Sequence, residues 1–308
     1  MYTSLRTTLG EKSAAGRPGD RERPAKPDHH DAAAAGYQVR VGTFAYREHR
    51  LAYTEFGSGT DVVVLVHGQL MSRRMHAPLA RALAETGFRV ITLDLLGHGD
   101  SERPEESWRY SMTEFGRQVL ALLDHLDVAR AVIGGTSLGA NVSLEVAIAA
   151  PQRAVGLLTE MPVLDNAIVA GLLAFAPLLF TARFAPAVIE LTRWFADRVP
   201  QGRQWIDVAT DTLHQEPAGM AATIHGIFFG RVAPAEELRR GIAVPVLVIG
   251  HRRDPVHPFG DAANLAAEIA GARFLEAESP LELRLRPARL TEEIRRFLLA
   301  IFAAQPAP

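Results

Sequence analysis

Ser137 lies at the centre of a Gly-x-Ser-x-Gly sequence, residues 135–139 (GTSLG). A strand-like apolar run precedes this sequence and a helical pattern follows it, which is the setting of a nucleophile elbow. The elbow projects the serine Oγ above the edge of a sheet, and its glycines avoid collisions with the adjoining strand and helix. The backbone N–H of Leu138, at the helix N-terminus, would face a developing oxyanion. We therefore expect Ser137 to be a nucleophile for acyl transfer.

The loop at residues 67–69 (HGQ) directly follows a buried-strand pattern at residues 62–66. One backbone N–H of this loop would lie opposite that of Leu138 and complete an oxyanion hole, and Gln69 is the expected donor. His67 and Gly68 are expected at the substrate site. A ring that hydrogen-bonds the local backbone and shapes the loop is favoured for His67 over a role as the catalytic base.

Asp254 follows a further strand pattern, residues 246–249, within the sequence GHRRDPVH of residues 250–257. An aspartate in this place can orient a base imidazole and stabilise its cation. The alternative is a surface aspartate that pairs with Arg252 or Arg253. We expect Asp254 to be the acid.

The general base is hard to identify from the sequence. The last histidine is His257, and the fifty-one residues that follow it contain none. Three accounts stay open. In the first, a histidine of another loop is the base, and His257 is preferred to His251 and His225 because it is expected at the carboxyl edge of the sheet. In the second, Ser137 works weakly without a base. In the third, the fold binds an apolar ligand or another protein without catalysis.

The elements that must position these residues alternate between strand and helix patterns. Alternating apolar and polar residues predict two antiparallel strands, and continuous apolar runs predict central parallel strands. With helical patterns between them, the sequence predicts an α/β fold, a mostly parallel sheet flanked by helices on both faces. The predicted strands are residues 37–41, 51–56, 62–66, 88–93, 131–134, 155–158, 246–249 and 273–275, and the predicted helices include 113–126, 138–149, 261–270 and 287–302.

Residues 163–243 interrupt this alternation with helical and unusually apolar sequence. We expect an inserted helical cap whose apolar side faces the site, with Phe175 and Phe228 contacting the substrate. The core would then comprise residues 36–162 and 244–304. The run 167–180 is too short for a transmembrane span, and Pro177 interrupts it.

Composition limits the partners of the protein. The 308-residue chain has a formal net charge of −2, which indicates neither a nucleic acid nor an anionic membrane as partner. It has no cysteine, which excludes disulfides and thiolate metal sites. Residues 1–35 lack a signal-peptide core and predict a disordered leader of a cytoplasmic protein. No cofactor or metal site is indicated, since His29 and His30 form no closed site. The oligomeric state is not predicted.

Several of these sequences together resemble the α/β-hydrolase superfamily, over about residues 37–298. The shared marks are HG at 67–68, GHGDS at 97–101, GTSLG at 135–139 and the segment 245–254. Ser137 resembles the serine branch rather than the haloalkane dehalogenases and epoxide hydrolases, which have an aspartate in the elbow. The resemblance implies hydrolysis of an ester, thioester or lactone, and less often of a C–C bond next to a carbonyl. The apolar cap favours a small, fairly apolar ester or lactone as substrate.

The chain departs from this superfamily in its final loop. Superfamily members carry the base histidine some seven residues before the proline that opens the last helix, and Pro280 stands in that place here. Glu278 and Glu282 flank it, and a buried carboxylate with a raised pKa could act as a base. The favoured interpretation is a solvated loop in which Glu282 pairs with Arg284 or Arg286.

Overall fold

The computed structural model describes residues 36–164, 167–200, 204–213, 216–228 and 230–305. Its strands are β1 (Val39–Tyr46), β2 (His49–Phe56), β3 (Val62–Val66), β4 (Arg89–Leu93), β5 (Ala131–Thr136), β6 (Ala154–Glu160), β7 (Val246–His251) and β8 (Arg273–Ala277). They form one sheet in the order β1-β2-β4-β3-β5-β6-β7-β8. β2 pairs antiparallel with β1 and β4, and the pairings from β4 to β8 are parallel. The predicted mostly parallel sheet is confirmed.

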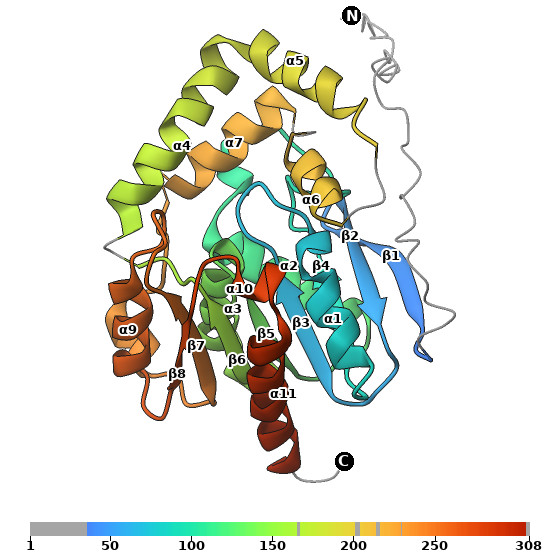
Figure 1. The fold of residues 1–308 in the computed structure, drawn as a ribbon, viewed down its shortest axis with the longest axis vertical. Coiled ribbons are helices and arrows are strands. Elements are labelled where there is room, and N and C mark those ends of the chain that lie inside the picture. Colours follow the sequence, from blue (N-terminus) through green and yellow to red (C-terminus); the bar gives the residue numbers. More distant parts are fainter. Residues whose placement is uncertain (1–35, 165–166, 201–203, 214–215, 229, 306–308) are drawn as a thin grey trace, which may run out of the picture.

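Helices cover both faces of this sheet (Figure 1). The α-helices are α1 (Ala77–Ala84), α2 (Met112–His125), α3 (Leu138–Ala149), α4 (Ala167–Phe184), α5 (Pro186–Ala196), α6 (Gln204–Leu213), α7 (Pro217–Phe228), α8 (Glu236–Arg240), α9 (Phe259–Glu268), α10 (Glu282–Leu285) and α11 (Ala288–Ala303). Short 3-10 helices in the described part of the chain occupy Arg73–His76, Ser107–Arg109 and Pro151–Arg153.

The two sides of β3 show why this stretch is apolar throughout. Val64 belongs to the core cluster that includes residues of α2, α3 and α9, whereas Leu65 belongs to the cluster of α1 and α11. Successive side chains of a strand point to opposite faces, so a strand with helices on both sides has no polar face. Each fully buried aliphatic side chain of this kind contributes about 1.5–3 kcal/mol to folding.

Element boundaries differ from the predictions by a few residues. The helix predicted at 261–270 is α9, which begins after Pro258 and ends at Glu268. The predicted strand 273–275 continues to Ala277. The helices α8 and α10, of five and four residues, were not predicted, because such short helices have too few turns for a clear apolar period. The helix α6 lies within the segment 163–243, which was predicted to be helical but was not resolved into this element.

The helices α4 to α7 lie together over one end of the sheet, at the top of the molecule in Figure 1. They follow β6 and precede β7 in the chain, as the predicted cap at 163–243 requires, although that boundary stays a prediction. Asn141, in the first turn of α3, holds both ends of this insertion. Its Nδ2 donates to the carbonyl oxygens of Val163 (2.6 Å) and Val232 (2.7 Å), and its Oδ1 accepts the N–H of Val163 (3.0 Å).

The outer surface of α4 and α5 is apolar, with exposed side chains that include Leu173, Phe180, Phe184 and Trp194. Within the described residues, no single helix is long and apolar enough to cross a membrane. One bent pair, Leu173–Phe184 with Pro186–Ala196 at 101°, reaches that threshold by length and composition alone. The predicted leader, residues 1–35, lies outside the described residues.

Candidate active site

Ser137 occupies a sharp turn between β5 and α3. Its φ of 55° and ψ of −109° are unusual for a residue with a side chain, and such a conformation costs about 1–3 kcal/mol. The turn is held on both sides, since the Ser137 N–H donates to the Glu160 carbonyl oxygen (2.8 Å) and the Ser137 carbonyl accepts from Asn141 (3.1 Å). The side chain of Ser137 is half-buried and thus accessible at the sheet edge.

The elbow glycines are required by close backbone approach. A Cβ at Gly135 would lie 2.2 Å from the Val66 carbonyl oxygen, and one at Gly139 would lie 2.0 Å from the same atom. Neither distance is compatible with a side chain. Strand β3 therefore packs directly against the elbow only because both residues are glycine.

His257 connects the serine to an acid. Its Nε2 lies 2.8 Å from Ser137 Oγ, and its Nδ1 lies 2.9 Å from Asp254 Oδ2. A carboxylate can only accept a hydrogen bond, so Nδ1 carries the proton and Nε2 is free to accept the serine hydroxyl. The three groups thus form the continuous hydrogen-bonded chain of a serine–histidine–acid triad.

The short spacing between Asp254 and His257 is made possible by a turn that the aspartate itself stabilises. Oδ1 of Asp254 accepts the backbone N–H groups of Val256 (2.8 Å) and His257 (2.9 Å). This turn brings the His257 imidazole close to the Asp254 carboxylate, whose Oδ2 remains available to accept the Nδ1–H. Burial raises the pKa of Asp254, but the hydrogen bonds and the charge of His257 outweigh it, so the pKa lies below its ordinary value.

The other candidate bases are placed elsewhere. His251 is buried, and its Nδ1 donates to the Ser279 carbonyl oxygen (2.7 Å). His225 is exposed on α7. Arg252 pairs with Glu276 rather than with Asp254. Among the histidines that the structure describes, His257 is the one whose ring hydrogen-bonds Ser137.

Of the two carboxylates beside Pro280, Glu278 is exposed, whereas Glu282 is buried and already paired. The expected pair of Glu282 with Arg284 or Arg286 is wrong, because Glu282 is buried and pairs with Arg289 (2.8 Å). Burial raises the pKa of Glu282, but Arg289 and the N–H of Glu278 outweigh it, so the pKa lies below its ordinary value. A carboxylate that is already paired and ionised is a poor proton acceptor.

The loop at 67–69 lies beside the elbow. A Cβ at Gly68 would lie 3.9 Å from Ser137 Cβ, so Gly68 is in contact range of the serine. His67 is fully buried, with Nδ1 donating to the Gly68 carbonyl (2.8 Å) and Nε2 accepting the N–H of Leu95 (3.0 Å). These two bonds to the local backbone fit the expected role of His67 in shaping the loop, and its place at the substrate site stays a prediction. The side chain of Gln69 contacts His98 (Oε1–Nε2, 3.3 Å).

Phe175 lies on α4 and Phe228 on α7, with ring centroids 5.5 Å apart. Both are partly buried against an apolar cluster that includes Leu70, Met220 and Ile224. Leu70 directly follows Gln69, so this cluster joins α4 and α7 to the loop beside the elbow. Contact of the two rings with substrate stays a prediction.

One polar group beside the site escaped the sequence reasoning. Glu160, at the end of β6, is buried beneath the elbow and pairs with Arg284. A carboxylate at the end of a largely apolar strand is the signal that could have indicated it. The described residues contain no group of three or more His, Asp or Glu side chains that could hold a metal ion.

Comparison with known proteins identifies the family. The model of the alpha/beta hydrolase fold matches residues 61–278. The 3-oxoadipate enol-lactonase 2 of Acinetobacter baylyi is 27% identical over 230 residues, which cover 74% of this chain and 84% of that protein. The enol-lactonase structure from Burkholderia xenovorans LB400 superposes with a TM-score of 0.64 at 25% identity, over 87% of this chain and 98% of that one.

Other relatives match over a shorter region. The dihydrolipoyllysine-residue acetyltransferase component of the acetoin cleaving system from Pseudomonas putida is 46% identical over 104 residues, which are 33% of this chain and 26% of that protein. The chain spans 36% and 19% of the length of two further curated relatives. Because the family model covers most of the sequence and the sheet has the corresponding order, the chain belongs to the α/β-hydrolase fold family.

Proposed function

We propose that the protein is a serine hydrolase that cleaves a small, fairly apolar ester, thioester or lactone through an acyl-enzyme on Ser137. The observation that carries this proposal is the unbroken chain from Asp254 through His257 to Ser137, with distances of 2.9 and 2.8 Å. A histidine three residues after the acid would thus take the place of the histidine that the family carries in its final loop.

In the first step, Ser137 Oγ attacks the carbonyl carbon of the substrate while His257 Nε2 takes its proton. Asp254, hydrogen-bonded to Nδ1, stabilises the resulting imidazolium. The tetrahedral oxyanion would accept hydrogen bonds from the backbone N–H groups of Leu138 and Gln69. His257 then gives its proton to the leaving oxygen or sulfur, and the carbonyl is restored as an acyl-enzyme.

In the second step, water attacks the acyl carbon while His257 Nε2 takes the water proton. Collapse of the second tetrahedral intermediate returns the proton to Ser137 Oγ and releases the carboxylic acid. A lactone gives a hydroxy acid, because its leaving alcohol remains part of the acyl group. The lowered pKa of Asp254 keeps its carboxylate ionised for both steps.

The substrate class is inferred from the cap and from the relatives. The cluster around Phe175 and Phe228 offers apolar surface, while Arg193 pairs with Glu190 and Arg231 with Glu145, so these cap-region charges are compensated. Relatives that span most of their own length in the match include enol-lactonases. An N-acyl homoserine lactone degrading enzyme also shares the fold, with a TM-score of 0.59.

A fluorophosphonate probe and a series of p-nitrophenyl esters test the proposal. We expect the wild type to be labelled and Ser137→Ala not to be labelled. His257→Ala should reduce ester turnover by at least about 10⁴-fold, whereas His225→Ala, a matched exposed histidine, should retain it. A wild type that neither labels nor exceeds the Ser137→Ala background would favour the alternative of a non-catalytic binder. Full activity in His257→Ala would assign the base elsewhere.

A further inference from the structure

The carboxyl ends of three neighbouring strands are joined by a buried polar network that no proposed chemical step uses. Its centre is Glu160, which ends β6 and is 2% exposed. Thr136, the last residue of β5, donates its hydroxyl to Glu160 Oε2 (2.5 Å). His251, the last residue of β7, lies beside this pair, with its Nε2 3.5 Å from Glu160 Oε1, which is an ion-pair distance rather than a hydrogen bond.

Arg284 of α10 closes this network from the C-terminal part of the chain. Its Nη1 pairs with Glu160 Oε1, and its Nη2 donates to Thr136 Oγ1 (2.8 Å). The Thr136 hydroxyl therefore donates to the carboxylate and accepts from the guanidinium at the same time, which uses both of its capacities. The side chain of Arg284 is only 8% exposed, so this pair is shielded from water.

The network contacts both halves of the candidate triad. Thr136 precedes Ser137 in the chain, and the carbonyl oxygen of Glu160 accepts the Ser137 N–H (2.8 Å). On the other side, His251 ends β7 three residues before Asp254. The strained turn at Ser137 and the loop that carries the acid and base thus share one buried anchor.

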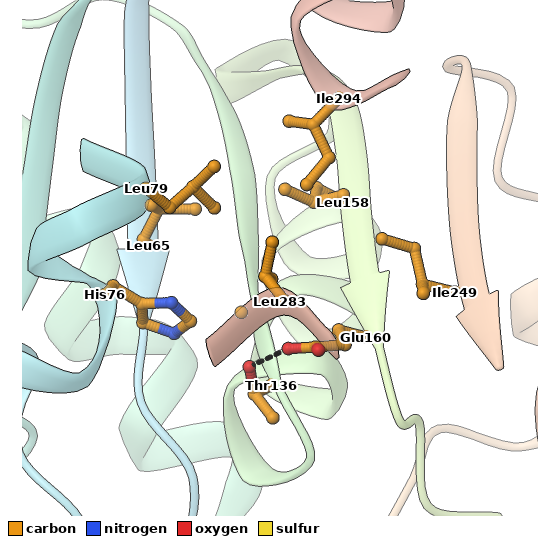
Figure 2. A pocket seen from close by; sticks show the side chains of 10 residues that line it. Leu65, His76, Leu79, Thr136, Leu158, Glu160, Ile249, Leu283 and Ile294 are labelled. Atoms are coloured by element: carbon orange, nitrogen blue, oxygen red, sulfur yellow. Dashed lines mark hydrogen bonds between the residues drawn. The ribbon is translucent and has the colours of Figure 1, made fainter. Parts of the chain in front are cut away.

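The cavity beside Glu160 and Thr136 is small and mostly lined by aliphatic side chains. Its volume is about 10 Å³. Figure 2 shows Glu160 and Thr136 with the other side chains of the lining, which include Leu65, Leu158, Ile249, Leu283 and Ile294. This volume is at the lower limit for one water molecule, and it is far too small for a substrate. Burial and the charge of Arg284 lower the pKa of His76, at the same cavity, to about 4, so this ring is neutral.

We infer that Arg284 and Glu160 are positioning residues, which fix the position of Ser137 relative to the loop that carries Asp254 and His257. The C-terminal segment, which supplies the base in the family, would here stabilise the elbow instead. The catalytic part of this inference rests on the proposed serine chemistry, whereas the anchoring of the elbow can be measured without it.

The test compares two buried ion pairs. Arg284→Met and Glu160→Gln break the network. The control, Arg239→Met, breaks the ion pair between Arg239 of α8 and Glu268 of α9, whose side chains are 5% and 11% exposed. We expect Arg284→Met and Glu160→Gln to lower kcat about 10- to 100-fold with little change in KM, because small misplacements of reacting groups cost this much. Arg239→Met should lower Tm and leave kcat unchanged. Equal losses of kcat in all three variants would overturn the inference.

Hydrogen exchange of the peptide that contains Ser137 gives a readout independent of turnover. We expect faster exchange at this peptide in Arg284→Met than in Arg239→Met, because the Ser137 N–H bond to Glu160 is loosened. Unchanged exchange would contradict the anchoring. If the wild type is inactive on esters but the exchange difference between Arg284→Met and Arg239→Met is observed, the proposed function is refuted and the anchoring of the elbow is retained.

Two milder pairs of variants cover the case in which Arg284→Met does not fold. Thr136→Val removes the bridging hydroxyl at constant shape, while Thr136→Ser keeps it. We expect kcat to fall in the first and to be retained in the second. Arg284→Lys should be intermediate, because one ammonium cannot reproduce the planar fork that contacts two groups. Equal kcat in Thr136→Val and wild type would refute the role of the network.

Discussion

Replacing Asp254 by asparagine separates the two tasks of this side chain. Oδ1 accepts two backbone N–H groups, at 2.8 and 2.9 Å, and Oδ2 accepts His257 Nδ1–H. Asparagine retains one oxygen acceptor, which can maintain the turn. Its NH2 group would then face Nδ1 and favour the tautomer whose proton is on Nε2, which cannot accept the Ser137 proton.

The expected loss follows from this change of tautomer. In serine–histidine–aspartate triads the same substitution lowers kcat by about 10⁴, which corresponds to about 5 kcal/mol of activation free energy. The free energy of unfolding should change by less than about 1 kcal/mol, since the turn hydrogen bonds remain. Asp254→Ala loses the turn as well, so we expect a further loss of about 2–3 kcal/mol of stability from the two unsatisfied backbone donors.

Steady-state ester hydrolysis and urea unfolding measure the two effects separately. Asp261→Asn is the matched control, because Asp261 is a buried aspartate of the same chain segment that accepts the Leu164 N–H (2.7 Å) and lies outside the triad. Its kcat should be unchanged. A kcat of Asp254→Asn within tenfold of the wild type would refute Asp254 as the partner of the base.

Four further outcomes follow from the structure. Gly139→Ala should destabilise the fold by more than about 3 kcal/mol in urea unfolding, because the new Cβ would lie 2.0 Å from a backbone oxygen; a smaller loss would mean that β3 can move away. Ser137→Gly should abolish turnover and raise stability by about 1 kcal/mol, since glycine tolerates a φ of 55°; an unchanged Tm would argue against strain at the elbow. Asn141→Leu should lower stability by about 3 kcal/mol and raise KM, because three backbone groups at the ends of the cap lose their partner; an unchanged KM would separate the cap from substrate binding. Burial raises the pKa of Glu160, but Arg284 and His251 outweigh this effect, so the pKa of Glu160 in the folded state is depressed. The ionised carboxylate therefore contributes stability at pH values above the ordinary pKa of about 4.3, and this contribution is lost as the pH falls below that value. The free energy of unfolding should consequently fall less steeply with acid in Glu160→Gln than in the wild type.

Local sequence patterns were sufficient for the fold and for the position of the elbow. The run 62–66 is apolar on both faces, and a strand of this kind is stable only between two layers of helices. The glycines at 135 and 139 are explained by one contact each with the Val66 carbonyl oxygen. Both signals can be recognised within short stretches of sequence, although the contact that explains the glycines joins distant segments. The role of Ser137 as nucleophile stays a prediction that the geometry supports.

The partners of Ser137 depended on contacts between distant segments. Its hydrogen bond to His257 joins residues 120 positions apart, and the pair of Arg284 with Glu160 spans 124 positions. Sequence spacing alone left three histidines open as the base, because the turn stabilised by Asp254 has no periodic signature. It also assigned the wrong partner to Glu282, since several arginines of the final segment were equally near in sequence.

The sequence by itself determined that this chain forms an α/β sheet with a serine at a strand-to-helix turn, because both features follow from local periodicity and steric demands. Only the tertiary structure decided which imidazole faces that serine and which carboxylate lies beneath it. These outcomes depend on where loops from β6, β7 and the C-terminal segment meet at one edge of the sheet. Long-range packing sets that meeting point, and no single segment encodes it.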